Sequence, residues 1–493
     1  MKRPAITEAI TNPDHLFIDG DWTRPSSTAL IDVNDSSTEE VFFQVAAAQA
    51  EDVHGAVTAA RRAFDTGPWP QLTPSERADW LRKIAAAWMK RSDAAGDGWT
   101  AESGTLRTIS GHLAAMCAGI FQYYAGLTEN FPWKEHHTSE DGLPSLLVRE
   151  PVGVVAAIIP WNAPALLMSH KVAPALLAGC TVVVKASPEA PTSAYLLASI
   201  CEEIGLPPGV INVITADRDV SELLVRHPGV DKVTFTGSTA AGRKIASICG
   251  DRIARCTLEL GGKSPAIILD DYDVAKAAAS IAYSAPIVTG QVCSSLTRLI
   301  VSKSRHDEFV DALRSALVDI KVGDPFDVSS QMGPLASAIQ RDRVESYIEK
   351  GRAEGADLVL GGGRPQHLNR GYYVEPTIFA NVDNGSVIAQ DEIFGPVLCV
   401  IPALNEAHAI EIANDTIYGL NASVFTEDSD RAYAVGRKIR AGTVGHNAFK
   451  TDFTIAFGGF KQSGLGREGG SEGILPFLES KTMIFERMPS SVT

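Results

Sequence analysis

From Val152 onward, short runs of apolar residues alternate with segments whose apolar residues recur at helical spacing. We expect strands over 154–159, 181–185, 210–215, 233–236 and 258–260, and helices over 165–177, 192–204, 220–226 and 240–249. Strands that are apolar throughout must be covered on both faces. The pattern therefore predicts a parallel sheet between two layers of helices, an open-sheet α/β fold.

A second alternation begins after Gly262 and predicts a second α/β domain. We expect strands over 266–269, 297–301, 373–379, 397–401 and 422–425 and near Leu358, with helices over 273–284, 309–320, 340–354, 407–414 and 430–437.

The first 150 residues are mixed. A short hairpin around Asp19-Gly20 precedes predicted helices over 51–64, 75–89 and 109–127. The polar stretch 133–143 and the extended stretch 146–151 predict either a surface hairpin or an assembly arm. The segment 480–485 alternates like an edge strand, which can pair with another element or with a second subunit.

Composition narrows the class of protein. A chain of 493 residues is too long for one core, and 45% hydrophobic with 21% charged residues is typical of a soluble globular protein. The net charge of −15 argues against nucleic acid as a partner but allows a nucleotide cofactor. No apolar leader follows Met1, and the apolar run 152–167 is interrupted too often to span a membrane.

The cysteines are odd in number, scattered and without a Cys-x-x-Cys pair. This argues against a disulfide framework or a bound metal and predicts a reducing, cytoplasmic compartment. Cys293 differs from the others because it follows Gly290 in a turn between a predicted helix and a predicted strand. Such a turn can present a thiolate, which attacks carbonyl carbon, although a lone cysteine is more often a buried packing residue. We interpret Cys180, Cys201 and Cys249 as packing residues.

Three other stretches have two interpretations each. The segment 235–242 lies where a strand gives way to a helix, so it is either a phosphate site at a helix N-terminus or a plain turn. Glu259, between two leucines, is either a general base of raised pKa or an exposed strand-end residue. Asn162, between two prolines, is either an oxyanion donor or the cap of a turn.

Together these stretches resemble the aldehyde dehydrogenase superfamily, in order and spacing, from about Phe17 to Phe485. The matching motifs lie at 160–162, 235–238, 259–263, 290–293, 333–335, 392–396 and 457–464. The resemblance implies oxidation of an aldehyde to a carboxylic acid with a nicotinamide cofactor.

The resemblance also implies the catalytic roles. Cys293 would attack the aldehyde to form a thiohemiacetal, whose oxyanion the Asn162 side chain and the Cys293 N–H would hold. Hydride transfer would leave a thioester, and Glu259 would activate the water that hydrolyses it. Lys171 and Glu468 would relay protons away from Glu259.

The cofactor would bind, by the same resemblance, at Ile159, Pro160, Trp161, Lys185, Gly237, Ser238, Leu260, Gly261, Glu392 and Phe394. Many NAD-using members have an acidic residue three positions after the lysine, which repels a 2′-phosphate. Here that position is Pro188, and Glu189 follows it. We expect NAD, with NADP as the open alternative.

The expected substrate pocket comprises Ala163, His170, Val292, Ser294, Phe449 and Phe453. Ala163 and His170 replace aromatic residues that many members carry, so the entrance should be wide. We expect bulky apolar or aromatic aldehydes, with His170 as a wall rather than a base.

These expectations divide the chain into three parts. A dinucleotide-binding domain would cover 1–128 and 152–261, a catalytic domain 262–462, and an oligomerisation arm 129–151 and 478–487, giving a homodimer or homotetramer. The alternatives are a semialdehyde or CoA-acylating dehydrogenase, a non-catalytic relative, and a thiol esterase that needs no nicotinamide nucleotide.

Overall fold

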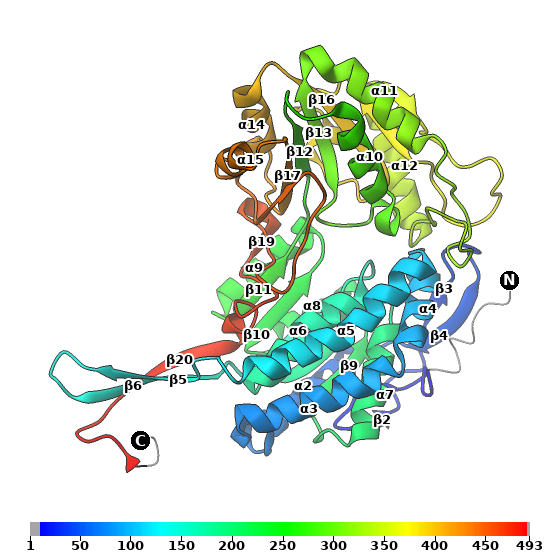
Figure 1. Cartoon of the computed structure of the whole chain (residues 1–493). Helices are drawn as coiled ribbons and strands as arrows, with labels where there is room; N and C mark the ends of the chain where they lie inside the picture. The colour runs from blue at the N-terminus through cyan, green and yellow to red at the C-terminus, as the bar shows by residue number, and fades with distance from the viewer. Residues whose placement is uncertain (1–9, 491–493) are drawn as a thin grey trace.

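The computed structural model describes residues 10–490, which form two large sheets with their helices and a narrow projecting arm (Figure 1). The expectation that no leader peptide follows Met1 concerns residues 1–9, which lie outside the described residues.

The first sheet has the strand order β19-β11-β10-β7-β8-β9-β1-β2. Its strands are β1 (Leu16–Ile18), β2 (Asp21–Thr23), β7 (Val154–Ile158), β8 (Thr181–Ala186), β9 (Ile211–Thr215), β10 (Lys232–Thr236), β11 (Arg255–Glu259) and β19 (Gly464–Leu465). The strands from β11 to β9 are parallel, and β7 to β10 are buried along their whole length. The chain runs from β7 outward to β9 and then returns to place β10 on the other side of β7. Ligands of open sheets bind at the carboxyl ends of strands where the order reverses in this way.

Helices cover both faces of this sheet. One layer contains α3 (Pro74–Met89), α4 (Ser92–Ser103), α5 (Arg107–Leu127), α6 (Pro164–Ala178) and α7 (Thr192–Ile204), with the short 3₁₀ helix η1 (Trp69–Gln71) beside them. The other layer contains α2 (Ala50–Asp65), α8 (Arg218–Arg226) and α9 (Thr239–Asp251). Apart from α4, each of these α-helices was predicted within a few residues of its observed ends.

The second sheet has the order β14-β15-β16-β13-β12-β17-β18. Its strands are β12 (Ser264–Ile268), β13 (Leu296–Ser302), β14 (Asp357–Leu360), β15 (Thr377–Ala380), β16 (Val397–Ala403), β17 (Asn421–Phe425) and β18 (Thr443–His446). Helices α10 (Val274–Ser284) and α11 (His306–Leu317) cover one face, and α12 (Ala338–Ala353), α13 (Val387–Gln390), α14 (Glu406–Asn414) and α15 (Ser429–Gly436) the other. Short 3₁₀ helices are η2 (Ile287–Gly290), η3 (Lys303–Arg305), η4 (Lys461–Ser463) and η5 (Leu475–Phe477).

One strand prediction in this sheet was wrong, and one strand was not predicted. The strand expected over 373–379 is reduced to β15, because Pro376 has no N–H to donate to a neighbouring strand. Strand β18 was not predicted, since it is short and Gly445 interrupts its apolar pattern.

The arm consists of β5 (Lys134–Thr138), β6 (Pro144–Pro151) and β20 (Leu478–Ile484), which pair antiparallel in the order β20-β6-β5. It extends away from the body of the molecule (Figure 1). The C-terminal segment therefore pairs with another element, as its edge-strand pattern predicted. A separate hairpin of β3 (Leu30–Asn34) and β4 (Val41–Ala46) was not predicted.

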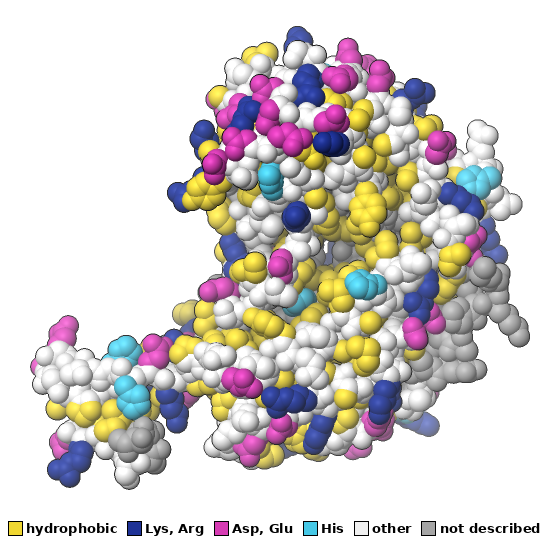
Figure 2. All heavy atoms as spheres, in the orientation of Figure 1, with side chains coloured by type: hydrophobic (Ala, Val, Ile, Leu, Met, Phe, Trp, Pro, Cys, Tyr) yellow, Lys and Arg dark blue, Asp and Glu magenta, His cyan; other side chains and the backbone are white. Residues whose placement is uncertain are grey.

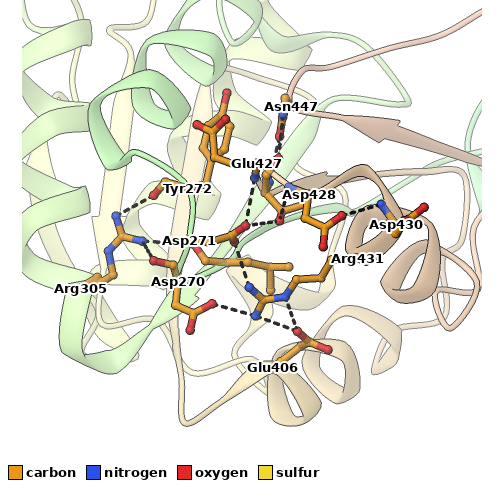
Figure 3. Close-up of polar contacts among 12 residues, drawn as sticks. Asp270, Asp271, Tyr272, Arg305, Glu406, Glu427, Asp428, Asp430, Arg431 and Asn447 are labelled. Carbon is orange, nitrogen blue, oxygen red and sulfur yellow. Dashed lines mark hydrogen bonds and ion pairs between the residues drawn. The ribbon is translucent and has the colours of Figure 1, made fainter.

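An ion-pair cluster ties α14 and α15 to the carboxyl edge of the second sheet (Figure 3). Arg431 on α15 pairs with Asp270 at 2.7 Å, with Asp271 at 3.0 Å and with Glu406 at 2.9 Å. Both aspartates follow β12, and Glu406 begins α14. One guanidinium group thus joins three segments that are far apart in the sequence.

We propose the same three-part division for the folded chain, because each part contains its own sheet. Strand β19 joins the first sheet from the stretch 463–477, which the division left unassigned. Among residues 10–490, no helix combines the length and the apolar character needed to cross a membrane.

Candidate active site

The carboxyl ends of β7, β10 and β11 bring together stretches from three parts of the sequence. Asn162 follows β7, Gly237 follows β10, and Glu259 ends β11. The Gly237 N–H donates to the Glu259 carbonyl at 3.0 Å, and the Ile159 N–H donates to the Lys185 carbonyl at 3.0 Å. These residues therefore lie on either side of the point where the strand order reverses.

The turn before Cys293 has a strained backbone. Val288, Thr289 and Gly290 have successive φ values of 49°, 55° and 73°, in the left-handed region that non-glycine residues avoid. The Thr289 hydroxyl donates to the Gly333 carbonyl at 3.1 Å. A Cβ at Gly290 would collide with the backbone of Gly395, so glycine is required there. Tight packing maintains a turn that presents Cys293 at the amino edge of the second sheet.

Gln291 holds this turn in place, a role that was not predicted from the sequence. Its buried side chain donates to the carbonyls of Ser103 at 3.3 Å and Val288 at 3.1 Å. Its carbonyl oxygen accepts from the Ala336 N–H at 3.0 Å. Its place between Gly290 and Cys293 was the available signal, but its partners lie too far away in sequence to be inferred.

Asn162 lies beside the same turn. Its side-chain N–H donates to the Gln291 carbonyl at 2.9 Å, and its own carbonyl accepts from the Trp99 indole at 2.9 Å. Helix α6 has Ala163 as its N-cap residue, without a side-chain cap. Asn162 is therefore not a helix cap, and its amide lies one hydrogen bond from the loop that carries Cys293.

Cys293 is partly buried, and burial raises the pKa of its thiol to about 12. The negative charges of Glu392 and Glu259 raise this pKa further. At neutral pH the sulfur is thus a thiol, and a neighbouring group must accept its proton before it attacks. The same interaction shows that Glu259 and Glu392 lie close enough to Cys293 to influence its ionisation.

Glu259 is buried, which excludes the alternative of an exposed strand end. Burial raises its pKa well above the ordinary value, and the charge of Glu468 adds to this effect. Lys171 and Arg467 act in the opposite direction. Within the described chain neither carboxyl oxygen has a hydrogen-bond partner, so both are available to a reacting water.

Lys171 and Glu468 form a buried ion pair next to Glu259. The Lys171 ammonium also donates to the Thr236 hydroxyl at 2.7 Å. The Thr234 hydroxyl donates to the same Glu468 oxygen at 3.4 Å. The arrangement favours the proton-relay interpretation of these two residues over an ordinary surface pair.

The expected cofactor residues surround the same edge. Glu392 accepts from the Gly262 N–H at 3.1 Å, and burial raises its pKa to about 7. A Cβ at Gly261 would collide with the Glu392 carboxylate. Trp161 and Phe394 meet edge to face with ring centroids 5.4 Å apart.

The phosphate-site stretch also has a defined geometry. Ser238 caps α9, with its hydroxyl accepting from the Ala241 N–H at 3.3 Å. Gly242 and Leu260 fit closely, because a Cβ at Gly242 would lie 2.5 Å from the Leu260 side chain. The N-terminus of α9, with Ser238 exposed, lies at the carboxyl edge of the sheet, and helix N-termini in such positions are suited to phosphate groups.

Lys185 is buried at the end of β8, and burial lowers its pKa to about 8. No hydrogen bond of its ammonium group is found among residues 10–490. A buried ammonium of this kind fits a ribose hydroxyl. Pro188 is followed by the exposed Glu189, which accepts from the Ser187 hydroxyl and favours the charged form of Lys185.

His170, Phe453 and Phe457 form an aromatic stack, with centroids 4.5 Å and 4.2 Å apart. Burial lowers the pKa of His170 to about 3, and Lys171 lowers it further, so the ring is neutral. Ala163, which follows Asn162, and Val292, which precedes Cys293, are both half-buried. Figure 2 shows this face of the molecule hollowed at its centre, with hydrophobic side chains around the hollow.

Ser294 and Phe449, also expected in the pocket, make contacts away from the aromatic stack. Ser294 is buried, and its carbonyl accepts from the Asn421 amide at 3.2 Å. Phe449 packs against the core beneath α10 and α11 rather than on the aromatic stack. The loop after β18 turns this ring towards the second sheet, which the sequence pattern did not indicate.

The fold, with a thiol and a buried carboxyl group converging where the two sheets meet, defines an α/β enzyme. The chain belongs to the aldehyde dehydrogenase family, whose model matches residues 22–483. This membership and the α/β architecture confirm the predicted family and fold class.

Individual relatives cover almost the whole chain. It is 45% identical over 470 residues to the geranial dehydrogenase of Castellaniella defragrans, covering 95% of this chain and 98% of the relative. It is 41% identical over 474 residues to the chloroplastic betaine aldehyde dehydrogenase of Amaranthus hypochondriacus, covering 94% and 95%. The crystal structure of a Mycobacterium tuberculosis aldehyde dehydrogenase complexed with NAD+ is similar with a TM-score of 0.93 and 45% identity, covering 96% and 98%.

Proposed function

We propose that this protein oxidises an aldehyde to a carboxylic acid: RCHO + NAD+ + H2O → RCOO− + NADH + 2 H+. The observation that carries the proposal is the convergence at Cys293. Asn162 holds the loop of the thiol, and the carboxyl group of Glu259 lies close by with both oxygens unpartnered among the described residues.

The first half of the reaction forms a covalent adduct on the enzyme. The thiol proton of Cys293 passes to a neighbouring carboxylate, and the sulfur bonds to the aldehyde carbon. The Asn162 amide and the Cys293 N–H donate to the developing oxyanion of the thiohemiacetal. When bound, the nicotinamide cofactor supplies the hydride acceptor that this oxidation needs.

The second half hydrolyses the resulting thioester. Glu259 takes a proton from water as the oxygen attacks the acyl carbon, and the carbon–sulfur bond then breaks. The raised pKa of Glu259 makes it a stronger base than an exposed glutamate. The Glu468 carboxylate accepts the proton onward, and the Lys171 ammonium, which donates to it, holds this carboxylate in place. A water-activating base at this position favours hydrolysis over acyl transfer to CoA.

NAD is the proposed cofactor, because the site fits it and the M. tuberculosis relative is complexed with it. Lys185 and Glu392 would hold the two ribose groups, and the N-terminus of α9 the pyrophosphate.

Because Pro188 carries no charge to repel a 2′-phosphate, we expect the kcat/KM preference for NAD over NADP to stay below about 100-fold, or ~2.8 kcal/mol. Pro188→Glu should increase it. A much larger preference in the wild type would show that another residue selects NAD.

The proposed substrates are bulky apolar or aromatic aldehydes. The neutral stack of His170, Phe453 and Phe457 supports this class, since it offers an apolar surface without a charge for a substrate carboxylate. Comparing kcat/KM across aliphatic, terpenoid and aromatic aldehydes tests the class.

A cytoplasmic location and a homodimer or homotetramer formed through the arm stay predictions. The assembly can be tested by light scattering.

The activity is tested by Cys293→Ala. We expect acid formation to fall to background, while binding of NAD, followed by calorimetry, stays unchanged because the sulfur is not needed to hold the cofactor. Cys256→Ala, which removes another partly exposed thiol, is the control and should retain activity. Retained turnover in Cys293→Ala would refute the nucleophile assignment.

A further inference from the structure

Lys232, at the start of β10, is a fully buried lysine that the proposed mechanism does not use. It is 1% exposed, and its ammonium group donates to the Thr257 hydroxyl at 2.7 Å. The ammonium lies 5.0 Å from the centroid of the Phe477 ring. Burying an ammonium group with so few partners is costly, so its presence calls for a physical reason.

The register of β10 and β11 places Lys232 in line with the active site. Lys232 pairs with Arg255, Thr234 with Thr257, and Thr236 with Glu259. Side chains of alternate residues project from the same face of a strand, and directly paired residues share a face. The side chains at 232, 234, 236, 257 and 259 therefore lie on one face, over about 13 Å of strand.

Polar contacts connect much of this series. Glu468 accepts from Lys171 and from the Thr234 hydroxyl, and Lys171 donates to Thr236. Thr257 lies directly opposite Thr234 and accepts from Lys232. A row of hydroxyl and amine groups thus extends from the relay pair of Glu259 to the amino end of β10.

The far end of the row lies beside an exposed residue. Arg255, paired with Lys232 across the strands, has a side chain 52% exposed that binds Glu479 of β20 at 2.7 Å. Figure 1 shows β20 leaving the body beside β10 and β11. The titratable groups whose charges act on the pKa of Lys232 are Cys256, Cys180, Glu468 and Lys171, and burial lowers this pKa to about 8.

We propose that Lys232 is a positioning residue for proton release, and that Thr234, Thr257 and Lys232 form a branch from Glu468 to solvent at the root of the arm. The inference rests on the proposed function, because Glu259 must return to its basic form after each thioester is hydrolysed. A proton taken from water by Glu259 passes to Glu468 and leaves along the hydroxyl row, with no change in any bond to carbon.

The test separates proton release from hydride transfer. In Lys232→Met we would measure NADH formation in the first turnover and hydrolysis of the Cys293 thioester by chemical quench, from pH 6 to 9. We expect unchanged first-turnover NADH and about tenfold slower thioester hydrolysis at pH 7. The rising limb of the pH profile of hydrolysis should move to higher pH, because removing a cation raises the pKa of nearby carboxyl groups.

Two further variants keep the test decisive if Lys232→Met does not fold. Thr257→Val, which breaks the row but keeps the lysine, should slow hydrolysis likewise, whereas Thr257→Ser should restore it. Lys276→Met, at an exposed lysine of α10, is the control. Equal losses in NADH formation and hydrolysis in Lys232→Met, or hydrolysis at the wild-type rate in Thr257→Val, would overturn the proposal in favour of a structural role. Absence of acid formation in the wild type would refute the proposed function itself.

Discussion

At the scale of single residues, burial favours the protonated form of both reacting acids. It raises the pKa of the Cys293 thiol to about 12 and that of Glu259 well above its ordinary value. A preformed thiolate is therefore absent at neutral pH. The thiol is activated only when its proton has somewhere to go, which protects it from unproductive reactions with other electrophiles.

The burial of His170 makes the stability of the folded protein sensitive to acid. Its folded-state pKa of about 3 is below the ordinary 6.5, so the unfolded chain binds the proton more readily. Its contribution to stability is complete above pH 6.5 and is lost as pH falls towards 3, by at most about 1.4 kcal/mol per pH unit. In urea unfolding, the loss of stability between pH 7 and pH 5 should be smaller in His170→Phe than in the wild type.

The matched control is His137→Phe, at an exposed histidine of the arm. It should keep the pH dependence of the wild type. If His170→Phe and the wild type lost the same stability between pH 7 and pH 5, the buried imidazole would not be the cause of that loss.

Residues within contiguous motifs could be predicted from the sequence, and residues held by distant contacts could not. Cys293, Glu259 and Asn162 each lie a few residues from a glycine or a proline in a recognisable stretch. Gln291 and Lys232 were missed because their partners, such as Ser103 and Thr257, come from other segments. The structure alone shows where these partners are.

At the scale of elements, tertiary packing determines the secondary structure of segments whose local preference is weak. Helix α4 contains two glycines and several polar residues that favour other conformations, so its sequence does not predict a helix. It forms because Trp99 is buried in the core and bonds to the carbonyl of Asn162. A helix of poor propensity thereby supports the residue that holds the nucleophile loop.

The Arg431 cluster allows a direct test of element docking. Arg431→Ala leaves Asp270, Asp271 and Glu406 facing one another without a cation (Figure 3). We expect a loss of about 1 kcal/mol in the free energy of unfolding, smaller at high salt because the pairs are partly exposed. Catalysis should persist, since the cluster lies at the sheet edge opposite Cys293. Arg437→Ala, just beyond α15, is the control; equal stability of both variants would contradict the docking role.

At the scale of the whole molecule, the site exists because the two sheets meet end to end. The carboxyl edge of the first supplies Asn162 and Glu259, and the amino edge of the second supplies Cys293. The alternating pattern of apolar segments predicted both sheets. It could not predict their relative placement, which depends on contacts such as that between the Asn162 amide and the carbonyl of Gln291.

The central claim is that Cys293 carries the acyl group which Glu259 then releases. The most direct measurement is the intact mass of Glu259→Gln after mixing with aldehyde and NAD. We predict one NADH per active site, followed by a stall, and a mass gain on Cys293 equal to the aldehyde less two hydrogens. Unmodified Cys293 together with steady turnover at the wild-type rate would contradict the account.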